Sequence, residues 1–143
     1  PLGAVMKAVG LSPFEATIRR TRLVIDMEQF IDCKIFVTRR YEEPSVDRLV
    51  RLSPPGACVV DVGANIGLVS LKLAEAVSEG GEVLAFEPSA WSRDRLARNL
   101  ALNAAENVTV EQAAVGAATQ EATTLLVPTV TGLTGATLPA KLR

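Results

Sequence analysis

The sequence predicts an α/β fold in which a parallel sheet is built from strands that alternate with helices. A β-branched stretch at 59–62, apolar except for the acid Asp61 near its end, leads directly into a glycine turn at 63–67, and a helical pattern starts at once. A second apolar run at 83–86 is followed by Glu87, and an acid roughly 20 residues past such a turn typically accepts hydrogen bonds from a ribose. Strand, tight turn and helix in this order are typical of the nucleotide pocket at the carboxyl end of an open sheet.

The length of 143 residues indicates one domain, and a composition that is 48% apolar is sufficient for a hydrophobic core. No run is long enough to span a bilayer, and no signal-peptide pattern opens the chain. The net charge of −1 gives no broad attraction to nucleic acid or to a membrane surface. Cys33 and Cys58 lack the spacing of metal ligands, and we interpret Cys58 as a small buried apolar residue. We therefore expect a cytoplasmic protein that binds neither nucleic acids nor membranes.

The chain contains no histidine. This excludes a histidine general base, a serine–histidine or cysteine–histidine nucleophile pair, and histidine metal sites within these residues. Any chemistry must rest on a cofactor, on carboxylates or on residues outside the chain, so we assign no catalytic residue and no metal site. Because the chain does not begin with methionine, we expect it to be a trimmed form of the natural protein.

Residues 1–44 are predicted to form an N-terminal extension, and residues 45–143 the main domain. The first part of the extension suggests a short helix or a loosely packed arm. Two apolar stretches follow, at 23–25 and 34–37, with a polar centre between them. We interpret these stretches as the two strands of a β-hairpin.

The main domain opens with two predicted helices that flank its first strand. The first begins at Pro44 or Ser45 and ends at the Ser53–Gly56 stop. The second follows the glycine turn and ends at Gly80 and Gly81. Each has one apolar side at helical spacing. These sides are Val46, Leu49, Val50 and Leu52 in the first helix, and Ile66, Val69, Leu73 and Val77 in the second.

A third helix, with Ser89 as its N-cap, is predicted to join the strand at 82–86 to a strand at 108–112. Another strand is predicted at 123–127, and a loop or weak edge strand at 131–139. The order strand, helix, strand, helix, strand predicts right-handed crossovers and a parallel sheet. We assign the third helix an apolar face, which comprises Leu96, Ala97, Leu100, Ala101 and Ala104. Its solvent-facing side comprises Arg93, Arg95 and Arg98. We interpret Asn99 and Asn103 as surface or C-terminal cap residues and Trp91 as a packing residue.

The glycine turn differs from a dinucleotide-binding loop at one position. Where the pattern Gly-x-Gly-x-x-Gly has its middle glycine, this turn has Asn65, and Asp61 stands just before it. A carboxylate here would repel a pyrophosphate but stabilise an amino group or a sulfonium-bearing amino acid, which favours a cationic nucleoside over NAD. Gly63 and Gly67 permit unusual backbone angles and close approach of a ligand, and Glu87 can accept both ribose hydroxyls. Alternatively, Asp61 caps the following turn or helix.

Five short motifs, in order and spacing between about Tyr41 and Gly116, resemble the FkbM family of class I S-adenosylmethionine-dependent methyltransferases. The resemblance implies a Rossmann-like three-layer fold with S-adenosylmethionine as cofactor. It also implies transfer of a methyl group, usually to a hydroxyl oxygen of a sugar or natural product. The motifs are VVDVGANIG at 59–67, AFEP at 85–88, NLALN at 99–103, Asn107 with Val108, and AVG at 114–116.

The resemblance also implies where the cofactor binds. The turn and the acid before it would hold the methionine part, Glu87 would hold the ribose, and residues after the second and third strands would border the adenine. The turn residues are Asp61, Gly63, Ala64, Asn65 and Gly67, and those beside the adenine are Pro88, Ser89, Gln112 and Ala113.

One departure from the family concerns the sheet. The family continues with a fourth strand that ends in Asp-x-Glu-Gly and pairs with the first, and this motif does not occur before Arg143. The strand at 59–62 would then be an exposed edge and an aggregation hazard. We therefore expect a fold that is incomplete at its C-terminal side. The chain would then be the cofactor-binding part of a larger protein, a truncated product, or a subunit whose sheet is completed by a homo-oligomer or a partner chain.

Two alternatives to a methyltransferase stay open at the level of sequence. The first is an NAD-dependent oxidoreductase domain, against which Asp61 and the missing central glycine argue. The second is a non-catalytic fragment that folds or associates with a partner but does not bind a cofactor. The missing part of the sheet keeps the second alternative open.

Overall fold

The computed structural model describes residues 2–118, which divide between Tyr41 and Glu42 into two compact units. The strand predicted at 123–127 and the loop predicted at 131–139 lie outside the described residues. Each unit has its own sheet, one of two strands and one of three. None of the helices in the described part of the chain is long and apolar enough to cross a membrane.

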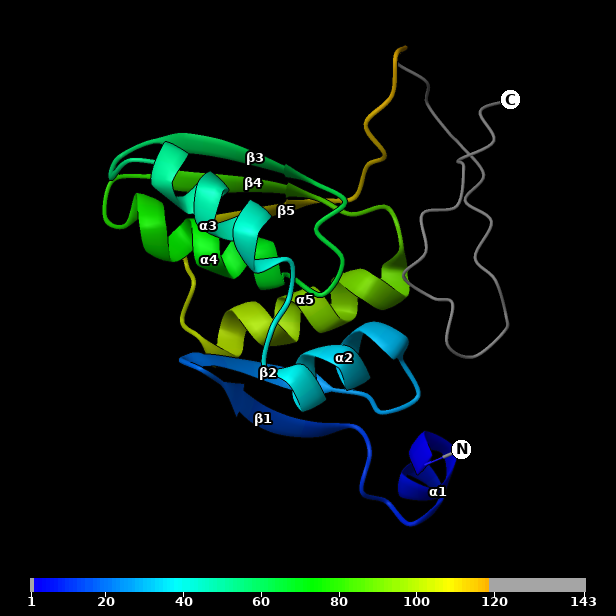
Figure 1. The fold of residues 1–143 in the computed structure, drawn as a ribbon. Helices are drawn as coiled ribbons and strands as arrows, with labels where there is room; N and C mark the ends of the chain where they lie inside the picture. The colour runs from blue at the N-terminus through cyan, green and yellow to red at the C-terminus, as the bar shows by residue number, and fades with distance from the viewer. Residues whose placement is uncertain (1, 119–143) are drawn as a thin grey trace. The chain divides into compact units, whose positions relative to one another are not determined.

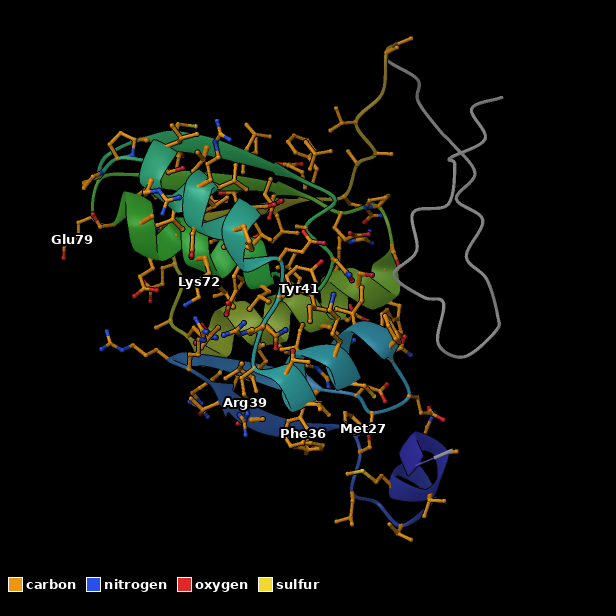
Figure 2. The ribbon with its side chains drawn as sticks, viewed as in Figure 1. Met27, Phe36, Arg39, Tyr41, Lys72 and Glu79 are labelled. Carbon is orange, nitrogen blue, oxygen red and sulfur yellow. The ribbon has the colours of Figure 1, made fainter. Side chains whose placement is uncertain are left out.

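The first unit contains a β-hairpin between two short helices. The helix α1 (Leu2–Ala8) comes first, and the helix α2 (Phe30–Thr38) comes last. Between them β1 (Phe14–Ile18) and β2 (Thr21–Ile25) pair antiparallel, with Phe14 opposite Ile25 and Ile18 opposite Thr21. The rings of Phe14 and Phe36 form a T-shaped pair with a centroid distance of 5.3 Å, which packs α2 against the hairpin. The Arg39 guanidinium lies 5.3 Å from the centre of the same Phe36 ring (Figure 2).

A hairpin was expected in this unit, but one of its two predicted strands is wrong. Residues 34–37 lie in α2, and the partner of β2 is β1. The β1 sequence has the true strand signal, because Phe14, Ala16 and Ile18 alternate with exposed polar residues. The apolar run at 34–37 has no such alternation, and a short run of this kind fits a strand and a helix equally well.

The second unit has a parallel sheet in the order β3-β4-β5, as the strand and helix order predicted. Val59 and Val60 of β3 lie opposite Val83 and Leu84 of β4. The helices α4 and α5 lie on the same side of this sheet (Figure 1). The elements are α3 (Glu43–Leu52), β3 (Cys58–Val62), α4 (Leu68–Val77), β4 (Glu82–Phe86), α5 (Ala90–Leu102) and β5 (Val108–Glu111).

One face of the sheet is covered and the other is exposed. On the covered face, Val83 of β4 packs with α4 in a buried cluster. On the opposite face of β3, Val60 and Val62 are 56% and 58% exposed. Cys58 shares this face and is exposed, so its interpretation as a buried residue is wrong. Within the described residues β3 is also an edge strand, as expected. The buried cluster comprises Leu73, Ala74, Val77 and Val83, with Ala57, Val59, Val69, Ala105 and Val108 against it.

The predicted helices form, but their buried sides differ from the prediction in α3 and α5. In α3, Val46 is buried and Leu52 is 70% exposed. Leu52 is exposed because its position around the helix axis lies outside the stripe that runs from Val46 through Val50. The helix α4 ends at Val77, before the predicted Gly80, and Ser78 follows it with φ 49°.

The buried stripe of α5 carries polar side chains that were predicted to face solvent. Arg95 is 8% exposed, and its guanidinium lies 4.8 Å from the centre of the Trp91 ring. Asn99 is fully buried, whereas Ala97 and Ala101 are exposed. The assignment of Arg95 and Asn99 to the helix surface is therefore wrong. The buried residues are Ser92, Arg95, Leu96, Asn99 and Leu100, which recur at i, i+3, i+4, i+7 and i+8.

Candidate functional site

Two carboxylates stand at the carboxyl ends of neighbouring parallel strands. Asp61 of β3 lies opposite Ala85 of β4, and Glu87 follows the last residue of β4. Parallel strands end on the same edge of a sheet, so the chain brings both acids to one place. Burial raises the pKa of the Asp61 carboxyl above its ordinary value, and the negative charge of Glu87 adds to this rise. The site therefore has a local excess of negative charge, which suits a cationic ligand.

Asp61 is held by the first turn of α4. The Ser70 hydroxyl, which is fully buried, donates to Asp61 Oδ2 at 2.6 Å. The Ser70 hydroxyl and backbone amide both favour the charged carboxylate and lower its pKa, although burial is the larger effect. The N-cap Gly67 has no side chain to cap the helix, so Asp61 acts as a remote cap of α4. The capping alternative considered from sequence is thus present, and it orients the carboxylate.

Replacing Asp61 with asparagine is expected to raise the melting temperature of the ligand-free protein at neutral pH. The folded-state pKa of Asp61 is raised above 3.8, so the folded protein is more stable when this carboxyl is protonated. That part of the free energy of unfolding is present at low pH and is lost as pH rises through the folded-state pKa. The gain in Asp61→Asn should therefore shrink as pH falls toward 4. Melting curves at a series of pH values measure it. A melting temperature lowered equally at every pH would contradict the assignment.

The glycine turn is anchored to the end of β4. The amides of Gly63 and Ala64 both donate to the Phe86 carbonyl, at 2.8 and 3.0 Å. The Gly67 amide donates to the Ala64 carbonyl at 2.8 Å, which closes the turn. Asn65 has φ 51°, a left-handed conformation that asparagine tolerates better than most residues. The turn thus lies at the sheet edge with a fixed backbone.

The two glycines of the turn have different surroundings. A side chain at Gly63 would meet no atom within 4 Å, so the backbone there is open to an incoming group. A Cβ at Gly67 would lie 2.2 Å from Leu96 Cδ1, so this glycine makes room for α5. Both residues have positive φ, at 81° and 85°. Gly63 therefore fits a ligand-facing role, whereas the small size of Gly67 serves helix packing.

Glu87 connects the turn to the loop that follows β4. Its side chain is 7% exposed. Oε2 accepts from the Asn65 amide and Oε1 accepts from the Ser89 amide, both at 2.9 Å. Arg93 Nη1 donates to the carbonyls of Glu87 and Pro88, at 3.0 and 2.6 Å. Each carboxylate oxygen has more than one acceptor position, so Glu87 keeps the capacity to bind a further donor.

The other predicted site residues lie along the same edge. Ser89 is the N-cap of α5, as predicted, and its hydroxyl accepts from the Ser92 amide at 3.4 Å. Gln112 and Ala113 follow β5, which pairs with β4. Ala64 is buried within the turn. All the predicted positions therefore fall at the carboxyl ends of β3, β4 and β5, or in the turn between β3 and α4.

Three residues that support the site were not identified from the sequence. They are Ser70, which holds Asp61, Arg93, which holds the end of β4, and Asn99, whose Nδ2 donates to the Ile66 carbonyl at 2.7 Å. Asn99 follows Leu96 by three residues and precedes Leu100, so its place on the buried stripe of α5 was the available signal. Asn103 is the C-cap of α5, as one of the two interpretations expected.

Comparisons with known proteins place this geometry in context. No protein-family model matches the sequence. The AMB antimetabolite synthetase AmbE of Pseudomonas aeruginosa is 40% identical over 78 residues, which are 54% of this chain and 3% of AmbE. Methyltransferase sdnD of Sordaria araneosa is 40% identical over 75 residues, which are 52% of this chain and 26% of sdnD. The match thus spans about a quarter of one relative and a small fraction of the other.

Among solved structures, M. jannaschii TYW2 in complex with AdoMet matches with a TM-score of 0.53 and 21% sequence identity. The match covers 67% of this chain and 41% of the TYW2 chain. At this level of identity the likeness shows the fold. The predicted Rossmann-like α/β class with a parallel sheet is therefore confirmed.

Proposed function

We propose that this chain provides the cofactor-binding part of an S-adenosylmethionine-dependent methyltransferase of the FkbM type. The observation that carries the proposal is the pair of carboxylates, Asp61 and Glu87, at adjacent strand ends beside the open backbone of Gly63. The 40% identity to methyltransferase sdnD over 75 residues supports the same activity. The TYW2 structure, which has the same fold, is a complex with AdoMet.

The residues present fit this cofactor. S-adenosylmethionine carries a positive sulfonium and an amino group, which the negative charge shared by Asp61 and Glu87 stabilises. We assign the methionine part to Asp61, Gly63 and Asn65, and the ribose hydroxyls to Glu87. Pro88, Ser89, Gln112 and Ala113 would border the adenine. When bound, the cofactor supplies an electrophilic methyl group, and the protein contributes alignment and exclusion of water.

For the methyl acceptor we propose a hydroxyl group of a sugar or natural product. The motif resemblance to the FkbM family supports this class. AmbE, an antimetabolite synthetase by name, also supports small-molecule chemistry. The net charge of −1 argues against a polyanionic acceptor such as RNA. A general base for the acceptor hydroxyl is assigned to no residue of this chain, because histidine is absent and both site acids serve the cofactor.

The cofactor assignment is tested by thermal stability of the 143-residue chain with S-adenosylhomocysteine, with NAD or without ligand. A ligand at 100 times its dissociation constant should add about 2.7 kcal/mol to the stability. We expect S-adenosylhomocysteine to raise the melting temperature and NAD to leave it unchanged. A shift with NAD alone would favour the oxidoreductase alternative, and no shift with either would favour a non-binding fragment. Glu82→Ala, which removes an exposed acid at the opposite end of β4, should leave the shift unchanged.

A further inference from the structure

The side chain of Asn99 in α5 makes a hydrogen bond to the turn at 63–67. We propose that Asn99 is a positioning residue: its side-chain amide fixes the Ile66 carbonyl and holds the turn in its ligand-ready conformation before the cofactor arrives. This inference rests on the proposed function. It concerns a residue that lies outside the predicted cofactor contacts and acts on them through the backbone.

The bond from Asn99 to the turn is buried. Asn99 has no exposed surface, and its Nδ2 donates to the Ile66 carbonyl at 2.7 Å. The two residues are 33 positions apart in the sequence, so the bond joins two separate elements. A buried carbonyl that loses its hydrogen-bond donor is left without a partner, and an unsatisfied buried acceptor costs free energy. The turn therefore depends on this side chain for the satisfaction of one of its own polar groups.

The bond fixes one peptide plane at both ends. The Ile66 carbonyl is held by Asn99, and the Gly67 amide of the same peptide group donates to the Ala64 carbonyl at 2.8 Å. The preceding Ala64–Asn65 peptide group is fixed in the same way, because its carbonyl accepts from Gly67 and its amide donates to Glu87. Neither plane can rotate without breaking two hydrogen bonds.

These two planes flank Asn65 and Ile66, and the Ile66–Gly67 plane also adjoins Gly67. Asn65 and Gly67 both have left-handed backbones, with φ 51° and 85°. The left-handed conformation costs free energy for any residue except glycine, less for asparagine than for most, and surrounding contacts offset this cost. Asn99 from α5 and Glu87 from the end of β4 supply these contacts through different peptide groups. A turn that is fixed in advance loses less entropy on binding a ligand, and this increases affinity.

Helix α5 is well placed for this role. Leu96, about one helical turn before Asn99, fills the space beside Gly67. Asn103 Nδ2 donates to the Asn99 carbonyl at 2.7 Å at the other end. The helix starts at its N-cap Ser89, whose amide donates to Glu87. Helix α5 thus contacts both loops of the candidate site, and the Asn99 side chain makes a hydrogen bond to the glycine turn.

The first test is the affinity of the full chain for S-adenosylhomocysteine, measured by titration calorimetry. Asn99→Asp keeps the shape but places an acceptor against the Ile66 carbonyl, and we expect binding about tenfold weaker or worse. Leu100→Ala is the control, because it removes a buried apolar side chain from the same helix and leaves the hydrogen bonds of the turn in place. It should bind with wild-type affinity. Equal affinities of Asn99→Asp and wild type would overturn the inference.

The second test needs no substitution and covers the case in which Asn99→Asp does not fold. Hydrogen exchange of the ligand-free wild type should show the amides of Asn65 and Gly67 protected to the same degree as the amides of α4 in the same experiment. Exchange at the rate of an open loop would overturn the inference. If the wild type does not bind S-adenosylhomocysteine, the proposed function fails, and the exchange result alone decides whether the turn is held in advance.

Discussion

Gly67→Ala is expected to lower the free energy of unfolding by about 2–5 kcal/mol, because a left-handed alanine costs roughly 1–2 kcal/mol and overpacking a core typically costs 1–3 kcal/mol. The new Cβ would meet Leu96 Cδ1 at 2.2 Å, and Leu96 is fully buried, so its side chain has little room to move. Chemical denaturation of the two proteins measures the difference. Because the clash involves one neighbour, Gly67→Ala with Leu96→Ala should cost less than the sum of the single changes.

Gly63→Ala is the matched comparison for this prediction. Gly63 has nearly the same φ, 81°, but open space where its Cβ would be. We expect a loss of only about 1–2 kcal/mol, from the backbone conformation alone. The new methyl group lies where the proposal places the cofactor, so the stability shift from S-adenosylhomocysteine should fall. An equal loss of stability in both alanine variants would contradict the distinction between the two glycines.

Glu87→Ala is expected to lower the free energy of unfolding by about 3 kcal/mol or more and to abolish the shift from S-adenosylhomocysteine. Its carboxylate accepts from the Asn65 and Ser89 amides, and hydrogen bonds to a charged group contribute roughly 1.5–3 kcal/mol each. The side chain is 7% exposed, so water has limited access to the two amides that are left behind. Denaturant unfolding and ligand-dependent melting measure the two effects.

Glu87→Gln separates charge from shape at the same position. The amide side chain offers one oxygen, so it can serve one of the two backbone donors and must point an N–H group toward the other. We expect roughly half the loss of stability seen in Glu87→Ala, with the ligand shift still greatly reduced. A Glu87→Gln protein as stable as the wild type would mean that the carboxylate does not hold these loops together.

Much of the second unit was predictable because its signals are local. The apolar run before Asp61, the glycine turn and the run before Glu87 define β3, the turn and β4 without reference to other residues. The N-cap Ser89 is another local signal, since a serine before a helical pattern has a direct capping role. The parallel order then follows from the alternation of strands and helices.

The errors arise where a pattern depends on tertiary contacts. Nothing in the short run at 34–37 distinguishes a strand from a helix, and the pairing of β1 with β2 decides it. Arg95 and Asn99 looked like surface residues because their side chains are polar, yet both lie on the buried stripe of α5. Cys58 looked buried because a free cysteine usually behaves as a small buried apolar residue, yet this face of β3 is exposed. The hairpin pairing and the exposed face of β3 depend on tertiary contacts that no single window of sequence encodes, whereas the spacing that buries Asn99 was available within α5 itself.

The attachment of the glycine turn has a practical consequence for protein engineering. The Phe86 carbonyl holds two peptide groups of this turn, and the Glu87 carboxylate and the Asn99 side-chain amide each hold one more. A designer who transplants 63–67 alone into another scaffold leaves all three anchors behind, and the graft should lose its shape. The portable module is the continuous stretch from β3 through Asn99.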